Sequence, residues 1–133
     1  MASCDGLVGL PEEELIQRLG QPSARRAVGS DTWLVFRSPS MMIRIRLAGT
    51  DPRRVASWTV SFDTGFQRLS EAAGAVGLWP AVGPEEDAGR VAAPLVRRPL
   101  PCPDSDRVYS FTATVRQGLF TALSVFDEAP DWI

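Results

Sequence analysis

Two stretches of the chain alternate apolar and polar side chains with a period of two. Residues 41–48, MMIRIRLA, place apolar side chains at the odd positions and arginines at two of the even ones. Residues 54–62, RVASWTVSF, alternate in a similar way. A period of two is the pattern of a strand with one buried face. Together with the short apolar run 32–37, these stretches predict an antiparallel meander, because turn-forming sequences separate them.

The alternation also predicts which side chains share a face of the sheet. Ala56 is expected on the buried face and Val55 on the opposite one. The buried face is expected to hold Ile43, Ile45, Trp58, Val60, Phe62, Tyr109, Phe111 and Val115. The opposite face is expected to hold Arg44, Arg46, Ser57, Thr59, Ser61, Thr112, Thr114 and Arg116. Trp33 and Trp58 lie within strands, and we expect both in the core.

Two segments are predicted to be short helices. Residues 10–22, LPEEELIQRLGQP, begin with a proline and three glutamates, which suit a helix N-terminus. Leu15, Ile16 and Leu19 share one face at helical spacing. Residues 66–80 also repeat apolar side chains at helical spacing, which predicts a second helix.

The second half of the chain is predicted to contain a long loop and a hairpin. Residues 80–106 hold more than half of the prolines and are expected to form an ordered wrap or a functional loop. A short edge strand near 93–98 is the alternative. Residues 107–116 and 119–127 have strand patterns, and the Gln-Gly pair between them supplies the turn.

The predicted element order is α-β-β-β-α-loop-β-β, in a single domain that spans residues 1–133. Helices and strands that are segregated along the chain indicate an α+β domain. We expect an antiparallel sheet of about five strands, with two helices packed on one face. The two halves also look like a loose repeat of a helix followed by a meander.

Missing residue types exclude several kinds of chemistry. The chain has no histidine, and its fourteen basic residues are all arginine. Without histidine there is no Ser-His or Cys-His nucleophile pair, and without lysine no Schiff base or phosphate-loop lysine. The absence of lysine and asparagine is typical of a GC-rich genome, which favours a bacterial source. Because the usual catalytic residue pairs are missing, we expect a protein without enzymatic activity.

Cysteine usage and net charge limit the partners further. Cys4 and Cys102 are too few for a structural zinc site, and we expect two free thiols, with a disulfide as the alternative. A net charge of −2 does not favour nucleic-acid binding. No apolar run is long enough to span a membrane, and no signal peptide is visible. These observations favour a cytoplasmic location, with a periplasmic lipoprotein as the alternative if a signal peptide has been removed. No cofactor or metal is predicted.

The carboxylates lie mainly in predicted loops. They are Glu85, Glu86, Asp87, Asp104, Asp106, Asp127, Glu128 and Asp131. No segment has the ligand spacing of an EF-hand, and a carboxylate-pair hydrolase would need two acids that face one cleft. We expect solvated loop charges, with Asp127 or Glu128 opposite Asp104 as the pair that a hydrolase could use.

Residues 1–63 carry a motif of helix and turn residues. It consists of Gly9, Leu15, Leu19, Gly20 and Pro22, followed by Trp33, Arg54 and Val55. In this motif the chain resembles the BamE/SmpA-type outer-membrane assembly lipoproteins and the repeats of β-lactamase inhibitor proteins. The match covers under half of the chain, and the second half carries no matching helix signature. The element order also looks like that of type III secretion chaperone-like and YbjN-like domains. Either resemblance implies a domain that binds another protein through the face or rim of its sheet.

The sequence therefore predicts a small, soluble, non-enzymatic domain that binds another protein as an adaptor, inhibitor or chaperone. One alternative is a domain that holds a small apolar ligand, with residues 80–106 as its lid. The other is an enzyme that uses only carboxylates and arginines. Homo-oligomerisation stays open. The residues expected to bind the partner are Arg44, Arg46, Arg116, Thr59, Thr112, Trp79 and Trp132.

Overall fold

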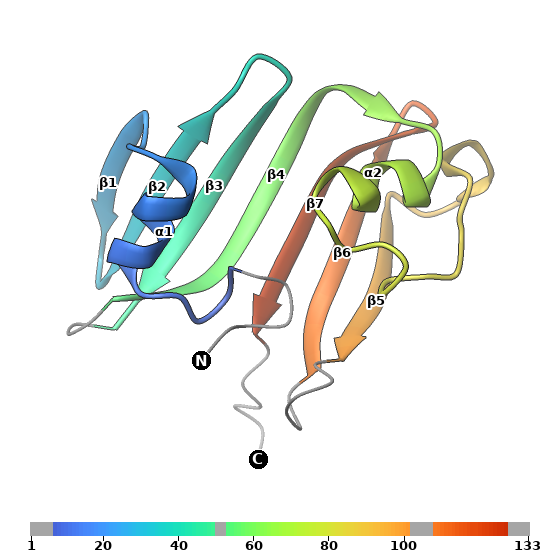
Figure 1. The fold of residues 1–133 in the computed structure, drawn as a ribbon. Coiled ribbons are helices and arrows are strands. Elements are labelled where there is room, and N and C mark those ends of the chain that lie inside the picture. Colours follow the sequence, from blue (N-terminus) through green and yellow to red (C-terminus); the bar gives the residue numbers. More distant parts are fainter. Residues whose placement is uncertain (1–6, 50–52, 102–107, 128–133) are drawn as a thin grey trace.

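Strands dominate the structure, a computed structural model that describes residues 7–49, 53–101 and 108–127. The elements are, in order, α1 (Glu12–Leu19), β1 (Ala24–Val28), β2 (Asp31–Arg37), β3 (Met41–Ala48), β4 (Arg54–Phe66), α2 (Leu69–Ala75), the 3-10 helix η1 (Ala88–Arg90), β5 (Leu95–Pro101), β6 (Val108–Arg116) and β7 (Leu119–Asp127). The strands form one seven-stranded sheet in the order β1-β2-β3-β4-β7-β6-β5 (Figure 1). Each neighbouring pair is antiparallel.

Two units, each a helix followed by a meander, build this sheet. Helix α1 precedes β1 to β4, and α2 with η1 precedes β5 to β7. Strands that are consecutive within a unit are neighbours in the sheet. The last strands of the two units, β4 and β7, pair with each other and join the halves. The loose repeat in the sequence is therefore present in the fold.

The expected fold, an α+β domain with about five strands in the order α-β-β-β-α-loop-β-β, is wrong in the number and order of its strands and in the balance between strand and helix. The sheet has seven strands and makes up most of the structure. The predicted order contains neither edge strand, β1 or β5, although β5 overlaps the strand near 93–98 that was given as an alternative. The five residues of β1, ARRAV, are all exposed, so they show no alternation. Strand β5 lies in the proline-rich segment 80–106. Proline is tolerated there because β5 is an edge strand.

Helix α1 follows from its local sequence. Pro11 is its N-cap, and three glutamates fill the first turn, where the helix dipole favours negative charge. Gly20 ends the helix with φ 84°, a conformation that favours glycine. Leu15 is fully buried. The carboxylate of Glu12 accepts hydrogen bonds from Arg25 of β1, which ties the helix to the edge of the sheet.

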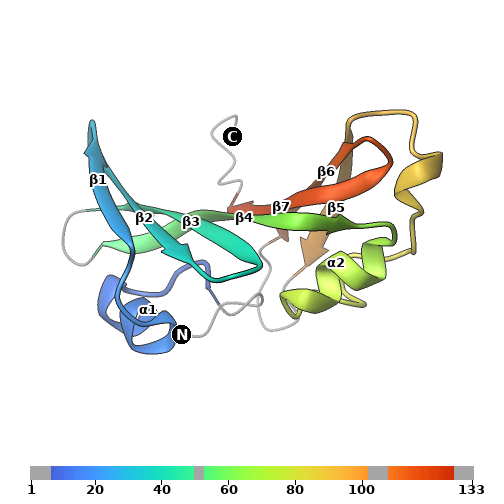
Figure 2. The same ribbon diagram turned by 90° about the horizontal axis from the view of Figure 1, so that it is seen from above.

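Helix α2 is shorter than the predicted segment 66–80. Phe66 is the last residue of β4, and Arg68 is the N-cap of the helix. Gly77 has φ 77°, which is incompatible with continuation of the helix. Both helices lie on the same side of the sheet, α1 near β1 to β3 and α2 near β4, β7 and β6 (Figure 2). Among the described residues, no helix has the length and apolarity needed to cross a membrane.

The hydrophobic core lies between the helices and the sheet. The buried side chains of the strands on this side include Leu34, Ile45, Trp58, Val60, Phe111, Phe120, Leu123 and Val125. The predicted buried face is thus confirmed for Ile45, Trp58, Val60 and Phe111. Ile43 and Val115 also pack against the core but stay partly exposed.

A β-bulge corrects the prediction for the start of β4. The register shifts between Arg46 and Leu47 of β3, so that Val55 pairs with Leu47 while Ser57 pairs with Arg46. The extra residue is Ala56. A bulge adds one residue to one strand and reverses the alternation on one side of it. Val55 is therefore the buried residue, with 2% of its surface exposed, and the expectation that Ala56 takes this place is wrong.

Trp33 is not a core residue. It alternates with Thr32 and Leu34 of β2, both of which are buried on the helix side. Its side chain therefore belongs to the opposite face of the sheet, where it is half-buried. The apolar run 32–37 did not show this, because both faces of β2 carry apolar side chains.

Candidate binding surface

One face of the sheet is covered by no helix of the described part of the chain. We call this face, opposite α1 and α2, the open face (Figure 2). Its side chains are mostly half-buried rather than fully exposed, because neighbouring strands pack their side chains against each other. The open face is therefore a pre-formed surface held by the sheet, and most of the predicted site residues belong to it.

A row of polar side chains crosses the middle of the open face. Strand pairing places Arg44 beside Thr59, Thr59 beside Ser124, and Ser124 beside Thr112. Arg97 of β5 completes the row beside Thr112. Arg44 and Arg97 are exposed at its two ends. Adjacent strands are about 4.8 Å apart, so the two end residues are separated by about 19 Å of sheet. We call this set the hydroxyl row.

The hydroxyl groups of the row are partly satisfied by one another. Thr59 Oγ1 and Ser124 Oγ are 2.8 Å apart and share a hydrogen bond. Thr112 is buried, with 8% of its surface exposed. The middle of the row is therefore ordered, and its two arginines are the groups that extend from it.

A second row contains Arg46 and Trp33. Arg26 of β1 pairs with Trp33, and Trp33 pairs with Arg46. The guanidinium of Arg46 is 3.3 Å from Asp31 Oδ2, and its Nε donates to the Ser57 hydroxyl at 3.3 Å. Arg46 is therefore bound to other side chains of the sheet, whereas Arg44 extends from it. The two arginines had been predicted to be equivalent.

The open face carries more arginines than acidic side chains. The arginines of the open face are Arg26, Arg37, Arg44, Arg46, Arg97 and Arg116, and its described acidic residues are Asp31 and Asp63. The whole chain nevertheless carries a net charge of −2. On the helix side, acidic side chains lie at the first turn of α1 and around α2, but arginines such as Arg25 and Arg98 pair with them. The open face is therefore a basic surface on an acidic protein.

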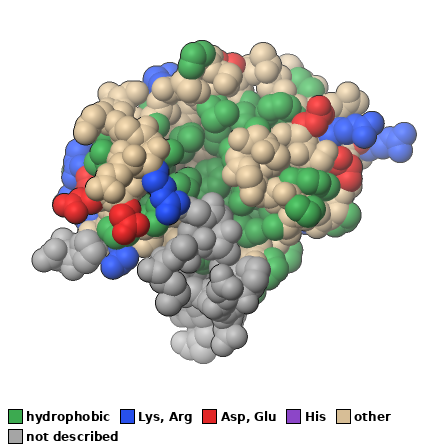
Figure 3. Space-filling view, in the orientation of Figure 1, with side chains coloured by type: hydrophobic (Ala, Val, Ile, Leu, Met, Phe, Trp, Pro, Cys, Tyr) green, Lys and Arg blue, Asp and Glu red, His purple; other side chains and the backbone are tan. Residues whose placement is uncertain are grey.

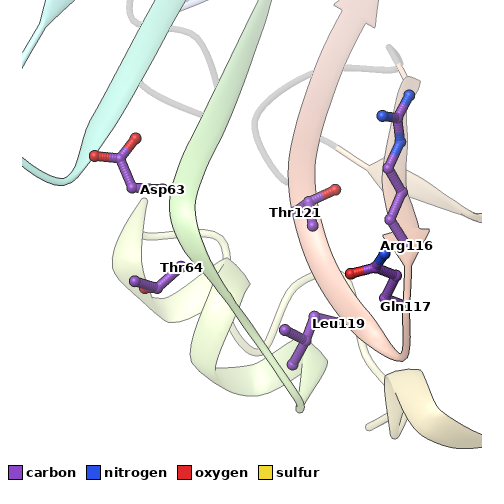
Figure 4. A pocket seen from close by; sticks show the side chains of 6 residues that line it. All are labelled: Asp63, Thr64, Arg116, Gln117, Leu119 and Thr121. Carbon is purple, nitrogen blue, oxygen red and sulfur yellow. The ribbon is translucent and has the colours of Figure 1, made fainter.

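Arg116 lies at the hairpin end of the open face. It lines a shallow depression together with Asp63, Thr64, Gln117, Leu119 and Thr121 (Figure 4). Figure 4 shows Asp63 and Thr64 on β4, with Thr121, Gln117 and Arg116 across from them on the β6–β7 hairpin. The depression mixes one arginine with one aspartate and polar groups, which suits a mixed polar contact rather than a purely anionic one.

The predicted tryptophans do not join these residues. Trp79 follows α2 on the helix side and is partly buried against the core. Its ring lies near Gly83, where an added Cβ would be 3.7 Å from Trp79 Cη2. Trp132 is outside the described residues. Arg44, Arg46, Arg116, Thr59 and Thr112 are thus brought onto one face, whereas Trp79 is not.

Four features of the open face were not predicted from the sequence: Arg26, Arg97, Ser124 and the place of Trp33 on this face. Arg26 and Arg97 lie on the two edge strands that were not recognised. The Gly-Ser pair at 29–30, with φ 61° at Gly29, is a turn signal that could have revealed β1, because two-residue turns connect hairpin strands. Ser124 lies in a central strand whose residues are mostly apolar, so the sequence shows no polar face there. Only the pairing of Ser124 with Thr59 and Thr112 places it in the row.

The acidic loop residues have structural roles. Glu85 accepts hydrogen bonds from the Ser70 hydroxyl and from the Ser70 N–H, the latter at 2.8 Å, and these bonds lower the pKa of its carboxyl. Glu86 pairs with Arg98 at 3.0 Å, and Asp87 accepts from the Gly89 N–H at 2.9 Å. Within the described residues, no three acidic or cysteine side chains cluster as metal ligands would.

The other predicted carboxylates cannot be placed at a site. Asp104, Asp106, Glu128 and Asp131 lie outside the described residues, as do Cys4 and Cys102. The backbone of Asp127 ends β7, opposite Tyr109. The carboxylate pair expected for a hydrolase therefore stays a prediction from sequence.

Comparison with known proteins gives a likeness of fold alone. No family model matches the chain, and no curated protein matches it. A crystal structure of a cysteine-rich secretory protein from Staphylococcus aureus subsp. aureus Mu50 is similar, with a TM-score of 0.52 at 8% sequence identity. The likeness covers 91% of this chain and 43% of that one, so this chain spans less than half of the similar protein.

Proposed function

We propose that the chain is a non-enzymatic protein-binding domain whose open face binds an acidic surface of another protein. The observation that carries the proposal is the excess of arginines over acidic side chains on the open face, where no described helix covers Arg44, Arg97 and Arg116. Arginine is enriched in protein interfaces and can bind a carboxylate through two parallel hydrogen bonds. The binding function belongs to the face rather than to a cleft.

The hydroxyl row adds a geometric requirement. Its two exposed arginines stand about 19 Å apart across the sheet, at the ends of a row of small polar side chains. A partner that contacts both would need carboxylates at a similar separation, with small or polar groups between them. Charge complementarity of this kind mainly raises the association rate and selects the partner.

Two doubly substituted variants test the proposal. Arg44→Glu/Arg97→Glu reverses both ends of the hydroxyl row. Arg53→Glu/Arg68→Glu makes the same change in net charge on the helix side, at exposed residues beside the N-termini of α1 and α2. Tagged wild type captures partners from the organism that encodes the chain. The partner is then purified, and its affinity for each variant is measured by calorimetry, after equal folding has been verified by circular dichroism.

We expect Arg44→Glu/Arg97→Glu, the row variant, to weaken binding by at least about tenfold. Arg53→Glu/Arg68→Glu, the helix-side variant, should weaken it by less than about twofold. Replacement of partner carboxylates by arginine should restore affinity for the row variant, because opposite charges would face each other again. Equal loss in both variants would show a nonspecific charge effect and would contradict the proposal, as would failure to capture any partner.

A second candidate is the apolar-ligand domain, which one observation favours. Figure 3 shows hydrophobic side chains at the surface between α1 and α2, on the helix side. Met41 and Ile43 of β3 are among the partly buried residues that pack on the core. Native mass spectrometry of the freshly purified protein tests this candidate: a bound small molecule would support it, and the bare mass of the chain would count against it.

A further inference from the structure

The two edges of the sheet differ in their capacity to accept another strand. Edge strand β5 contains Pro99 and Pro101, which have no N–H to donate. Because proline in a sheet is confined to positions whose missing N–H faces away from the neighbouring strand, these residues remove donors from the outer edge of β5. Edge strand β1, ARRAV, contains no proline, and all five of its side chains are exposed. The edge of β1 is therefore the one with a complete set of donors.

The pairing of β1 with β2 shows which donors face outward. Val28 pairs with Asp31 on either side of the two-residue turn Gly29–Ser30, and such flanking residues form a hydrogen-bonded pair. Hydrogen-bonded and non-bonded pairs alternate along an antiparallel ladder. Ala24, Arg26 and Val28 thus bond to β2, whereas the N–H and C=O groups of Arg25 and Ala27 point away from the sheet.

The charge of β1 opposes pairing between two copies of this chain. Antiparallel self-pairing centred on the strand would place Arg26 directly opposite Arg26 of the second copy. Like charges that face each other across strands are destabilising. An incoming strand with a carboxylate at that position would instead form an ion pair on the open face, beside Arg26 and its neighbour Trp33. Val28, which is 52% exposed on the same face of β1, offers apolar surface for the same strand to cover.

We propose that an extended acidic segment of the partner adds to β1 as a further strand, with its alternate carboxylates on the open face beside Arg26. Main-chain hydrogen bonds to Arg25 and Ala27 supply affinity, and the arginines of the open face supply selectivity. The inference rests on the proposed function, since it names the way in which the acidic partner docks.

The test uses a synthetic peptide, Thr-Glu repeated four times with blocked termini, and its Thr-Lys counterpart. Ala27→Pro removes an outward N–H and places a ring where the added strand would lie, while the bonds from β1 to β2 are kept. Ala27→Thr is the matched control, because it keeps the N–H and favours a strand. Affinity is measured by calorimetry, and amide hydrogen exchange is followed by NMR in the full chain, with Arg44→Glu/Arg97→Glu in parallel.

We expect the Thr-Glu peptide to slow amide exchange at Arg25 and Ala27. Ala27→Pro should weaken the peptide at least about tenfold and Ala27→Thr less than about twofold, and the Thr-Lys peptide should not bind. Equal binding to the Ala27→Pro variant, or no protection at these two amides, would overturn the strand addition. If the strand addition failed this test but Arg44→Glu/Arg97→Glu still weakened binding of the purified partner, the proposed function would stand without this inference. If Ala27→Pro and Arg44→Glu/Arg97→Glu both kept wild-type affinity for the purified partner, the proposed function itself would be wrong.

Discussion

The two faces of the sheet differ in burial, although the same strands form both. On the helix side, Phe111, Leu123 and Val125 have no exposed surface. On the open face, the neighbouring residues Ser110, Ser124 and Phe126 in the same strands are half-buried. A period of two in the sequence thus separates the core face from the proposed binding face within single strands. We therefore expect substitutions one residue apart to differ in effect: one should lower stability, and the next, if the proposed function holds, should weaken partner binding.

The largest expected effect compares a phenylalanine on each face. Phe111→Ala leaves a cavity in the core and should lower the free energy of unfolding by about 3–5 kcal/mol. Phe126→Ala removes a half-buried ring from the open face and should cost less than half as much, because the site is partly solvated. Urea unfolding measures both. Equal losses would show that the open face is as much a part of the core as the helix side.

The hydroxyl row provides a second test of the comparison. Thr59→Val and Ser124→Ala each remove one partner of the 2.8 Å hydrogen bond. A double-mutant cycle should give a coupling energy of about 0.5–1.5 kcal/mol, the usual net value of one hydrogen bond. The measurement is again urea unfolding of the single and double variants. A coupling energy of zero would mean that the pair is not formed in solution.

Arg44 and Arg46 sharpen the comparison within the open face. Arg46→Ala breaks the contacts to Asp31 and Ser57 and should cost about 0.5–1 kcal/mol of stability, since the ion pair is partly exposed. Arg44→Ala should change stability by less than about 0.5 kcal/mol, as an exposed surface substitution does. Partner affinity should respond in the opposite order, with Arg44→Ala as the more harmful change. An equal effect of both variants on stability would contradict the distinction.

The smallest expected effect is a pH dependence that arises on the helix side. The hydrogen bond from the Ser70 hydroxyl is the main cause that lowers the pKa of Glu85 below its usual value of 4.5. A lowered folded-state pKa contributes stability that is present above pH 4.5 and is lost as the pH falls through the folded-state value. Glu85→Gln should therefore be slightly less stable than wild type at pH 7, and the difference should vanish in acid.

Thermal unfolding across this pH range provides the measurement, and Glu13→Gln, at an exposed residue in the first turn of α1, is the control. A difference between wild type and Glu85→Gln that persists unchanged below the pKa would contradict the role of the ionised carboxylate.

How much of the fold and site could be predicted depended on local pattern. Strands β3 and β7 match the predicted ranges 41–48 and 119–127, because each run is bounded by turn residues. Strand β1 could not be found in this way, since all five of its side chains are exposed and create no period of two. Strand β5 buries Val96 and Leu100, but Arg98 stands between them and two prolines interrupt the pattern, so only a short strand near 93–98 was predicted, as an alternative. Arg44, Thr59 and Thr112 were correctly assigned to one face. Arg97 was not assigned to it, because a strand near 93–98 was only an alternative and its pairing with Thr112 could not be predicted.

The sequence by itself determined the alternation that divides most strands into two faces, the helix of residues 12–19 and the turn at 117–118. These features depend on neighbouring residues, whose steric and capping preferences act locally. Only the tertiary structure decided that β4 pairs with β7 and so joins Arg44 to Arg97 through one row. It also decided that a bulge buries Val55 and that Trp33 faces away from the helices. The physical reason is that strand order, register and the face on which helices pack result from contacts between residues far apart in the chain.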